Sequence, residues 1–307
     1  MSPVSKKKLK KKKQSSLHSL IKSRKYFGLF SIIIILFVGF IIFIKFELKP
    51  VIETGKTEVS KIPKDVEKTL KKAGTPERFR IPILMYHYVE YVQDKKDTIR
   101  ESLNIYPDVL DQQIKTLQDD GYTFITASEL ADILNHKGEL PQKPILLTFD
   151  DGHWDLYTNV LPILEKYHVK ATAYIISGFI GGSDFLTKDQ LQKVIQSGLV
   201  EIGAHTVHHI GLAKRFLTLV KYEVNASKKQ LENNYHIKVI SFAYPSGLFD
   251  EQAIKVVKEA GFKTSVSTIP GIEQNIANRF FLYRIRPGYR TGEMLLEYLK
   301  QEQFRPW

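Results

Sequence analysis

Cysteine is absent from the 307-residue chain. This absence excludes a disulfide framework, thiolate catalysis and cysteine-ligated zinc sites. It is compatible with the outside of a bacterium that does not rely on disulfides. The chain also lacks a detectable repeat at a fixed period, and its 43% hydrophobic content is ordinary for a globular protein with a substantial core.

Excess positive charge is lacking beyond the N-terminal segment. The formal net charge is +12, but eleven of the 45 lysines and arginines lie within residues 1–46, where there is no acidic residue. The remaining 34 basic residues nearly balance the 33 acidic ones. The sequence therefore argues against nucleic acid as a partner, because a phosphate backbone would call for clustered charge on the folded domain.

The N-terminal segment has the pattern of a membrane anchor. Residues 1–25 are basic, and residues 26–44 are nineteen residues without a charge, which is long enough to cross a hydrocarbon core. No small-residue cleavage pattern follows, so we expect an uncleaved signal anchor rather than a secretory signal peptide. The positive-inside rule then predicts a single-pass protein of the cell membrane, with its basic tail in the cytoplasm and everything after residue 45 outside.

Two further regions follow the predicted transmembrane helix. Residues 45–79 are rich in Lys, Glu, Thr and Pro and predict a solvated extracytoplasmic linker, with a short helix near residues 65–72. Residues 80–307 alternate apolar runs with amphipathic stretches. Strands are predicted at residues 81–86, 122–125, 145–149, 171–176, 200–203, 239–243, 264–267 and 281–285.

The segments between these strands carry helix signals. Pro107 is expected to open a helix, and the pairs Thr126 with Glu129 and Thr187 with Gln190 match the capping box of a helix start. Gly198 and Gly261 lie where the C-terminal cap of a helix is expected. Alternating strands and helices indicate a parallel sheet, and seven or eight such repeats over about 225 residues favour an α/β barrel over an open sheet.

Two adjacent carboxylates, Asp150 and Asp151, follow the predicted strand 145–149, whose apolar run is bounded by Pro144 and Gly152. Catalytic groups collect at such strand ends in α/β barrels. A carboxylate bound to a divalent cation has its lone pairs committed, whereas its neighbour stays free to take a proton from an activated water. We therefore expect one aspartate to bind metal and the other to act as a base.

Three histidines within five residues supply the other expected ligands. Two imidazoles and one carboxylate leave a coordination position of zinc open for water, which is typical of a catalytic site. His205 and His209, four residues apart, can face one ion, but His208 is an alternative, and spacing does not choose between them. An Asp-Asp-Gly sequence alone is often only a turn; the histidine cluster shifts the balance to a metal site.

The pattern resembles a known family. Thr148-Phe-Asp-Asp151, followed about fifty residues later by His205-Thr-Val-His-His209, resembles the first two motifs of the polysaccharide deacetylases, the NodB-like or carbohydrate esterase family four. Pro82–Val89 resembles the opening strand of many members, and Ser241–Gly247 resembles the third motif of the poly-N-acetylglucosamine deacetylase branch. The resemblance covers residues 80–286 and implies a distorted (β/α) barrel with about seven parallel strands.

The resemblance also implies roles. Asp150 would be the catalytic base, while Asp151, His205 and His209 would hold Zn²⁺ or another divalent transition metal. The arginine that often orients the base in the third motif is replaced by Ala243. Arg284 is the expected substitute, although it is nearly as well explained as a purely structural ion-pair partner.

In many members of the family, the histidine of a last motif, Leu-x-His, is the general acid, and residues 288–307 of this chain contain no histidine. His87, at the end of the first strand, is our first candidate for the acid, followed by His208 and His153. Trp154, Tyr244 and Pro245 are expected to contact substrate, although the two aromatic rings are equally consistent with packing. The backbone N–H of Tyr244 is a candidate for stabilising the oxyanion.

These residues predict an enzyme: a metal-dependent hydrolase that deacetylates N-acetylated sugars in a cell-surface polysaccharide, of the peptidoglycan or poly-N-acetylglucosamine type, and releases acetate. An O-acetyl esterase acting on xylan or another glycan is the alternative enzyme, because the same site cleaves esters. An inactive glycan-binding descendant is the alternative of another class. The intact Asp150 argues against it, since a binding site has little need of a free carboxylate beside the metal.

Overall fold

A computed structural model describes residues 61–70, 76–94 and 96–301. Within these ranges, no helix combines the length and the apolar character needed to cross a bilayer. The basic tail at 1–25 and the expected anchor at 26–44 lie outside the described residues. The part of the expected linker that is described contains one short helix, α2 (Lys64–Leu70), close to the predicted one.

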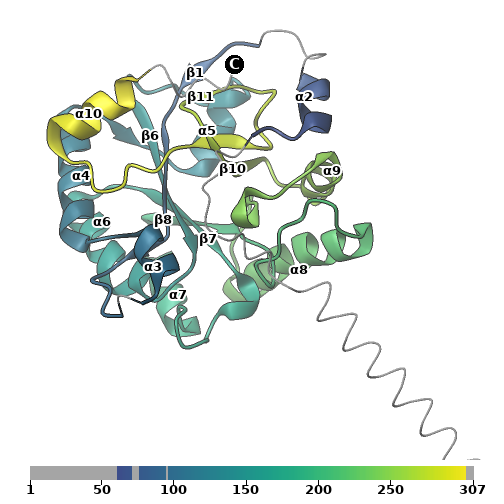
Figure 1. The fold of residues 1–307 in the computed structure, drawn as a ribbon, viewed down its shortest axis with the longest axis horizontal. Helices are drawn as coiled ribbons and strands as arrows, with labels where there is room; N and C mark the ends of the chain where they lie inside the picture. Colours follow the sequence, from purple (N-terminus) through teal and green to yellow (C-terminus); the bar gives the residue numbers. More distant parts are fainter. Residues whose placement is uncertain (1–60, 71–75, 95, 302–307) are drawn as a thin grey trace, which may run out of the picture. The chain divides into compact units, whose positions relative to one another are not determined.

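Parallel strands form a near-closed barrel (Figure 1). The strands run in the order β12-β10-β9-β8-β7-β6-β2, and a short strand, β5, pairs with the start of β6. Their bounds are β2 (Ile83–Tyr86), β5 (Thr123–Phe124), β6 (Pro144–Asp151), β7 (Ala171–Ile175), β8 (Val200–Ala204), β9 (Ser241–Ala243), β10 (Thr264–Pro270) and β12 (Leu282–Arg284).

The ring closes between its first and last strands. Leu84 of β2 bridges Ile285, the residue after β12, in parallel fashion. The N–H of Met85 donates to the carbonyl of Ile285, and the N–H of Ile285 donates to the carbonyl of Ile83, both at 2.9 Å. The expected distorted barrel of about seven parallel strands is therefore confirmed.

Burial explains why these segments are strands. All eight residues of β6 are buried, as expected for a parallel strand covered on both faces. Tyr174 of β7 is a fully buried member of the core. Gly203 of β8 makes room for this ring, because a Cβ there would lie 2.4 Å from Cδ1 of Tyr174.

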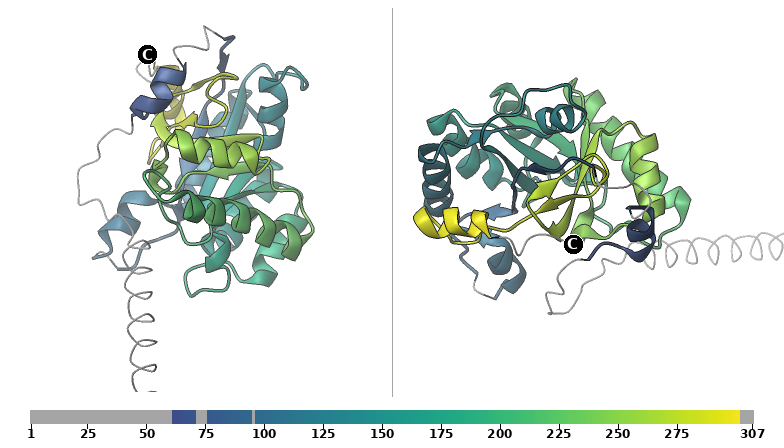
Figure 2. Two further views of the ribbon diagram at one scale, coloured as in Figure 1. Left: turned by 90° about the vertical axis from the view of Figure 1, so that its right-hand side faces the viewer. Right: turned by 90° about the horizontal axis from the view of Figure 1, so that it is seen from above.

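Helices surround the sheet (Figure 2). They are α4 (Pro107–Asp119), α5 (Ala127–Leu134), α6 (Leu161–Tyr167), α7 (Lys188–Gln196), α8 (Leu217–Tyr235), α9 (Glu251–Glu259) and α10 (Gly292–Lys300). Both predicted capping boxes are present, at the starts of α5 and α7. Gly198 and Gly261 follow α7 and α9 with φ of +70° and +82°, which is the left-handed conformation of a helix C-terminus.

Short elements complete the fold and were not predicted. They are β1 (Phe79–Arg80) paired with β11 (Glu273–Gln274), β3 (Tyr88–Val89) paired with β4 (Asn104–Ile105), α3 (Thr98–Leu103), the π-helix η1 (Leu156–Val160) and the 3-10 turns η2 (Ser177–Phe179) and η3 (Pro245–Gly247). Two-residue strands carry no periodic signal, which is why sequence patterns do not reveal them.

Candidate metal centre

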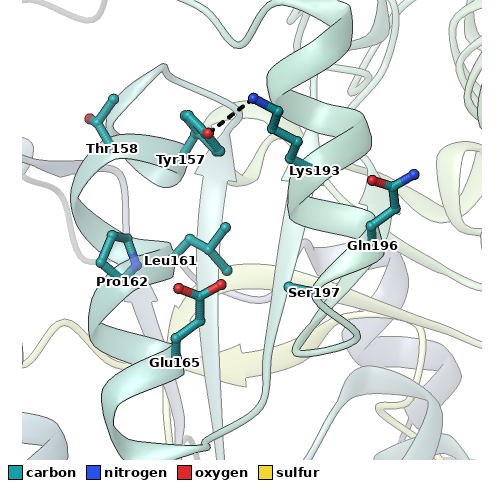
Figure 3. A pocket seen from close by; sticks show the side chains of 8 residues that line it. All are labelled: Tyr157, Thr158, Leu161, Pro162, Glu165, Lys193, Gln196 and Ser197. Carbon is teal, nitrogen blue, oxygen red and sulfur yellow. Dashed lines mark hydrogen bonds between the residues drawn. The ribbon is translucent and has the colours of Figure 1, made fainter.

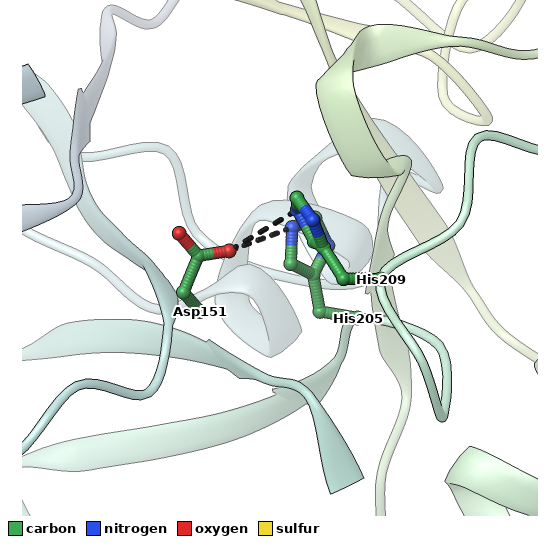
Figure 4. A group of neighbouring side chains, drawn as sticks. All are labelled: Asp151, His205 and His209. Carbon is green, nitrogen blue, oxygen red and sulfur yellow. Dashed lines mark ion pairs between the residues drawn. The ribbon is translucent and has the colours of Figure 1, made fainter. Parts of the chain in front are cut away.

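Asp151, His205 and His209 converge where β6 and β8 end (Figure 4). The Nε2 atoms of His205 and His209 lie 3.4 Å and 3.3 Å from Oδ1 of Asp151. One ligand atom from each residue lies within 4.8 Å of the others. Oδ1 of Asp151 is buried and has no hydrogen-bond partner among the described residues. A buried carboxylate oxygen facing two imidazole nitrogens fits a divalent cation, because the cation would satisfy all three groups.

The backbone at this site is bent into an unusual conformation. Asp151, Thr206 and His209 have φ of +76°, +64° and +55°, which is the left-handed region that side chains with a Cβ seldom adopt. Such conformations cost free energy and persist only where the surrounding structure enforces them, and they cluster at functional sites. The two segments that deliver the candidate ligands are therefore held in place by their surroundings.

His205 is fixed by a hydrogen bond on the far side of its ring. Its Nδ1 lies 2.8 Å from the carbonyl of Ala243 in β9, and its side chain is buried. A carbonyl only accepts, so Nδ1 carries the hydrogen and the lone pair of Nε2 points to the other ligands. Metal-bound histidines are typically oriented in this way.

His208 is held away from the cluster by Glu223 of α8. The Nδ1 atom of His208 lies 2.7 Å from Oε1 of Glu223. The other carboxylate oxygen, Oε2, accepts hydrogen bonds from the backbone N–H groups of Val207 and His208 at 2.9 Å and 3.0 Å. Glu223 is fully buried. This arrangement separates the two alternatives left by spacing, because His209 faces Asp151 and His208 faces Glu223.

Sequence reasoning missed Glu223, although a signal exists. The residue lies on the buried face of α8 together with Val220, Val224 and Ser227, at helical spacings of three and four. A carboxylate on an apolar stripe needs a partner, because burying an unpaired charge is costly. The neighbouring histidine-rich segment supplies that partner.

Asp150 is bound by Arg284 at two points. Nη1 and Nη2 of Arg284 each donate to one oxygen of Asp150 at 2.7 Å, Nη1 also donates to Oγ1 of Thr148 at 3.1 Å, and Nε donates to the carbonyl of Ser267 at 2.8 Å. Burial raises the pKa of the Asp150 carboxyl, but the Arg284 guanidinium outweighs it, so the pKa lies below its ordinary value. Asp150 is therefore ionised at neutral pH.

His87 lies beside this pair, as expected, but its charge state opposes the role of acid. Its Nε2 is 3.9 Å from Oδ2 of Asp150. Burial lowers the pKa of His87 to about 4, and the attraction of Asp150 and Asp151 does not restore it, since Arg284 and Arg286 act in the opposite direction. A neutral imidazole has no readily donated proton at neutral pH, so our first candidate for the general acid is not favoured.

His153 lies on the other side of the metal-site carboxylate. Its Nε2 is 3.4 Å from Oδ2 of Asp151, and its ring stacks between Tyr88 at 4.0 Å and Phe185 at 4.8 Å. Its Nδ1 lies 3.2 Å from the carbonyl of Asp184 and therefore carries a hydrogen. This packing holds the His153 ring beside Asp151.

Two of the three expected substrate contacts are buried. The ring of Tyr244 has no exposed surface and stacks on Phe249 in the core. Its hydroxyl donates to the carbonyl of Phe280 at 3.0 Å. Its backbone N–H donates to the carbonyl of Val266 at 3.3 Å, so neither stacking on a sugar nor oxyanion binding is open to Tyr244 in this structure. Pro245 is also buried, whereas Trp154 keeps part of its surface.

One pocket of the structure is unrelated to this centre (Figure 3). It lies between α7 and the segment formed by η1 and α6, where Nζ of Lys193 is 3.5 Å from the hydroxyl of Tyr157. None of the residues that line it belongs to the metal cluster or to the Asp150–Arg284 pair. The candidate site is therefore defined by the metal cluster and the Asp150–Arg284 pair, and not by this pocket.

Comparisons with known proteins agree on one family. The family model described as polysaccharide deacetylase matches residues 137–265. The Bacillus subtilis protein YxkH, whose name places it among the polysaccharide deacetylases, is 30% identical over 234 residues, which are 76% of this chain and 80% of that protein. A poly-beta-1,6-N-acetyl-D-glucosamine N-deacetylase of Staphylococcus aureus is 27% identical over 221 residues, with coverages of 68% and 75%.

A solved structure is similar as well. The Streptococcus pyogenes deacetylase PplD, determined in complex with acetate, is 32% identical and superposes with a TM-score of 0.67, covering 74% of this chain and all of that one. The segment matched by the family model contains Asp150 and the three candidate ligands but ends before Arg284.

The opposed directions of His208 and His209 generate a prediction. His209→Ala should lower the metal content of the purified protein, measured by atomic emission, and weaken metal affinity by on the order of tenfold or more, because a direct ligand is lost. His208→Ala is the matched control and should retain most of the metal, since its ring is bound to Glu223. Metal loss in His208→Ala with full occupancy in His209→Ala would reverse the ligand assignment.

Proposed function

Because the chain belongs to the polysaccharide deacetylase family, we propose that it removes N-acetyl groups from the sugars of a cell-surface polysaccharide by metal-dependent hydrolysis. The observation that carries the proposal is a pair of adjacent aspartates with different partners. Asp151 faces two imidazoles, whereas Asp150 forms a two-point ion pair with Arg284. Since a relative acts on poly-beta-1,6-N-acetyl-D-glucosamine, that polymer is the first substrate to consider.

The donor set supports zinc as the metal. Asp151, His205 and His209 would hold the ion through one carboxylate oxygen and two ring nitrogens, a combination typical of catalytic zinc and also suited to other divalent transition metals. When bound, the ion supplies a Lewis acid that polarises the acetyl carbonyl and activates water.

The residues of the chain perform the proton transfers. Asp150 is ionised and accepts a proton from the attacking water, while Arg284 and Thr148 fix the orientation of the pair. Deacetylation also requires a proton on the leaving amine. With the pKa of His87 at about 4, we propose that Asp150 returns the proton it has taken, so that acetate and a free amine are the products.

The proposed substrate is tested by acetate release from three polymers side by side: poly-β-1,6-N-acetylglucosamine, purified peptidoglycan and O-acetylated xylan. We expect the amide of N-acetylglucosamine to be cleaved, with the β-1,6-linked polymer preferred. Asp150→Asn serves as the inactive control. Release from xylan alone would establish the O-acetyl esterase instead, and release from none of them would favour an inactive glycan-binding protein.

The Arg284–Asp150 pair sets a pH dependence. Arg284→Gln removes the cation that lowers the pKa of Asp150, so that pKa should rise, and the acid limb of the kcat/KM profile should move to higher pH with metal content unchanged. Because breaking a buried ion pair costs about 3–5 kcal/mol, the melting temperature should fall as well. Arg284→Lys is the control that keeps the charge. An acid limb that does not move in Arg284→Gln would reduce Arg284 to a structural role.

We also propose that residues 26–44 anchor the protein in the cell membrane with the catalytic domain outside. The support is the sequence: nineteen uncharged residues follow a basic tail that contains no acid. Protease added to intact protoplasts should digest the domain and spare a small N-terminal fragment. Protection of the domain, or a mature N-terminus beyond residue 44, would contradict the anchored topology.

A further inference from the structure

Three tyrosines form an exposed aromatic surface, here called the tyrosine ledge: Tyr91, Tyr106 and Tyr289. The ring centroids of Tyr91 and Tyr106 lie 5.1 Å apart in a stacked arrangement, and those of Tyr106 and Tyr289 lie 5.2 Å apart edge to face. Tyr91 and Tyr289 are 56% and 50% exposed. Large aromatic side chains gathered at the surface commonly mark a binding site.

The ledge lies at the edge of the barrel that carries the metal centre. Tyr91 follows β2 in the segment that also supplies His87 and Tyr88, and Tyr289 follows β12, which ends with Arg284. Since β2, β6 and β12 are parallel, their C-terminal ends share one edge with Asp150. Tyr88, three residues before Tyr91, stacks on His153 beside Asp151.

Hydrogen bonds hold the ledge in a fixed shape. The hydroxyl of Tyr91 donates to Oδ1 of Asp108 at 3.2 Å. The buried side chain of Gln113 donates to the carbonyls of Gly288 and Arg290 at 2.7 Å and 2.8 Å, which fixes the backbone on both sides of Tyr289. A surface organised before binding loses little conformational entropy when a ligand arrives.

The chemistry of the ledge suits a neutral sugar chain. A tyrosine offers a flat apolar face and a polar hydroxyl, which match the C–H face and the hydroxyl rim of a pyranose ring. Tyr91 is hydrogen-bonded to an acid, Asp108, which disfavours an anionic ligand such as a phosphate. Continuity with the metal centre indicates that the occupant is the same polymer whose acetyl group is cleaved.

We propose that the tyrosine ledge binds sugar units of the polysaccharide that lie along the chain from the unit being deacetylated. This inference rests on the proposed function and extends it from a single sugar to a polymer. Short substrates that occupy only the metal centre do not reach the ledge, whereas longer ones do. The ledge therefore makes affinity depend on chain length.

The test compares β-1,6-linked N-acetylglucosamine oligomers of two and six units with the full-length protein. Tyr91→Ala combined with Tyr289→Ala should raise KM for the hexamer about threefold to tenfold, the range expected for lost aromatic stacking, and should leave kcat and the kinetics of the dimer unchanged. Tyr289→Phe keeps the ring and should retain most of the affinity for the hexamer. Tyr122→Ala, immediately before β5 on the opposite edge of the barrel, is the control aromatic substitution.

The outcomes separate this inference from the proposed function. If the wild type releases acetate and the double variant has an unchanged KM for the hexamer, the ledge does not bind glycan and the proposed function stands. If the wild type releases no acetate, calorimetric binding of the hexamer to wild type and double variant tests the ledge alone. Equal binding, or none to either, would overturn the inference, and weaker binding to the double variant would support it.

Discussion

The two-point ion pair between Arg284 and Asp150 is the interaction on which the site depends. It joins the last strand of the barrel to β6, and the guanidinium is buried above the ring of Tyr174. A buried arginine without its carboxylate, or the reverse, would leave an uncompensated charge, so the two residues fix each other. The pairing also decides which of two adjacent aspartates is free for a metal, because Asp150 has both oxygens engaged and Asp151 has one oxygen with no donor.

The candidate metal ligands are held by a second set of contacts around them. The carbonyl of Ala243 fixes the ring of His205, and Glu223 binds the backbone between His205 and His209. The small residue at 243, where an orienting arginine is expected in the family, thus contributes through its backbone. The orienting charge instead comes from Arg284 at the end of β12, further along the sequence.

The sequence predicted the barrel well because its signals are local. Every predicted strand position contains a strand, and the capping boxes at Thr126 and Thr187 begin helices. The candidate ligands could be named because strand ends and histidine spacing imply convergence. Sequence patterns did not reveal the features that depend on long-range packing. The direction of the His208 ring is set by Glu223 on α8, and the burial of Tyr244 is set by the core around it. The low pKa of His87 results from its desolvation in the folded protein.

The different roles of the two adjacent aspartates can be measured through the metal content and the turnover of two single variants. Asp150→Asn should retain its metal and lose turnover by on the order of a hundredfold or more, since general-base catalysis is removed. Asp151→Asn should lose the metal itself. Equal metal loss in both variants, or full turnover in Asp150→Asn, would show that the roles are not divided in this way.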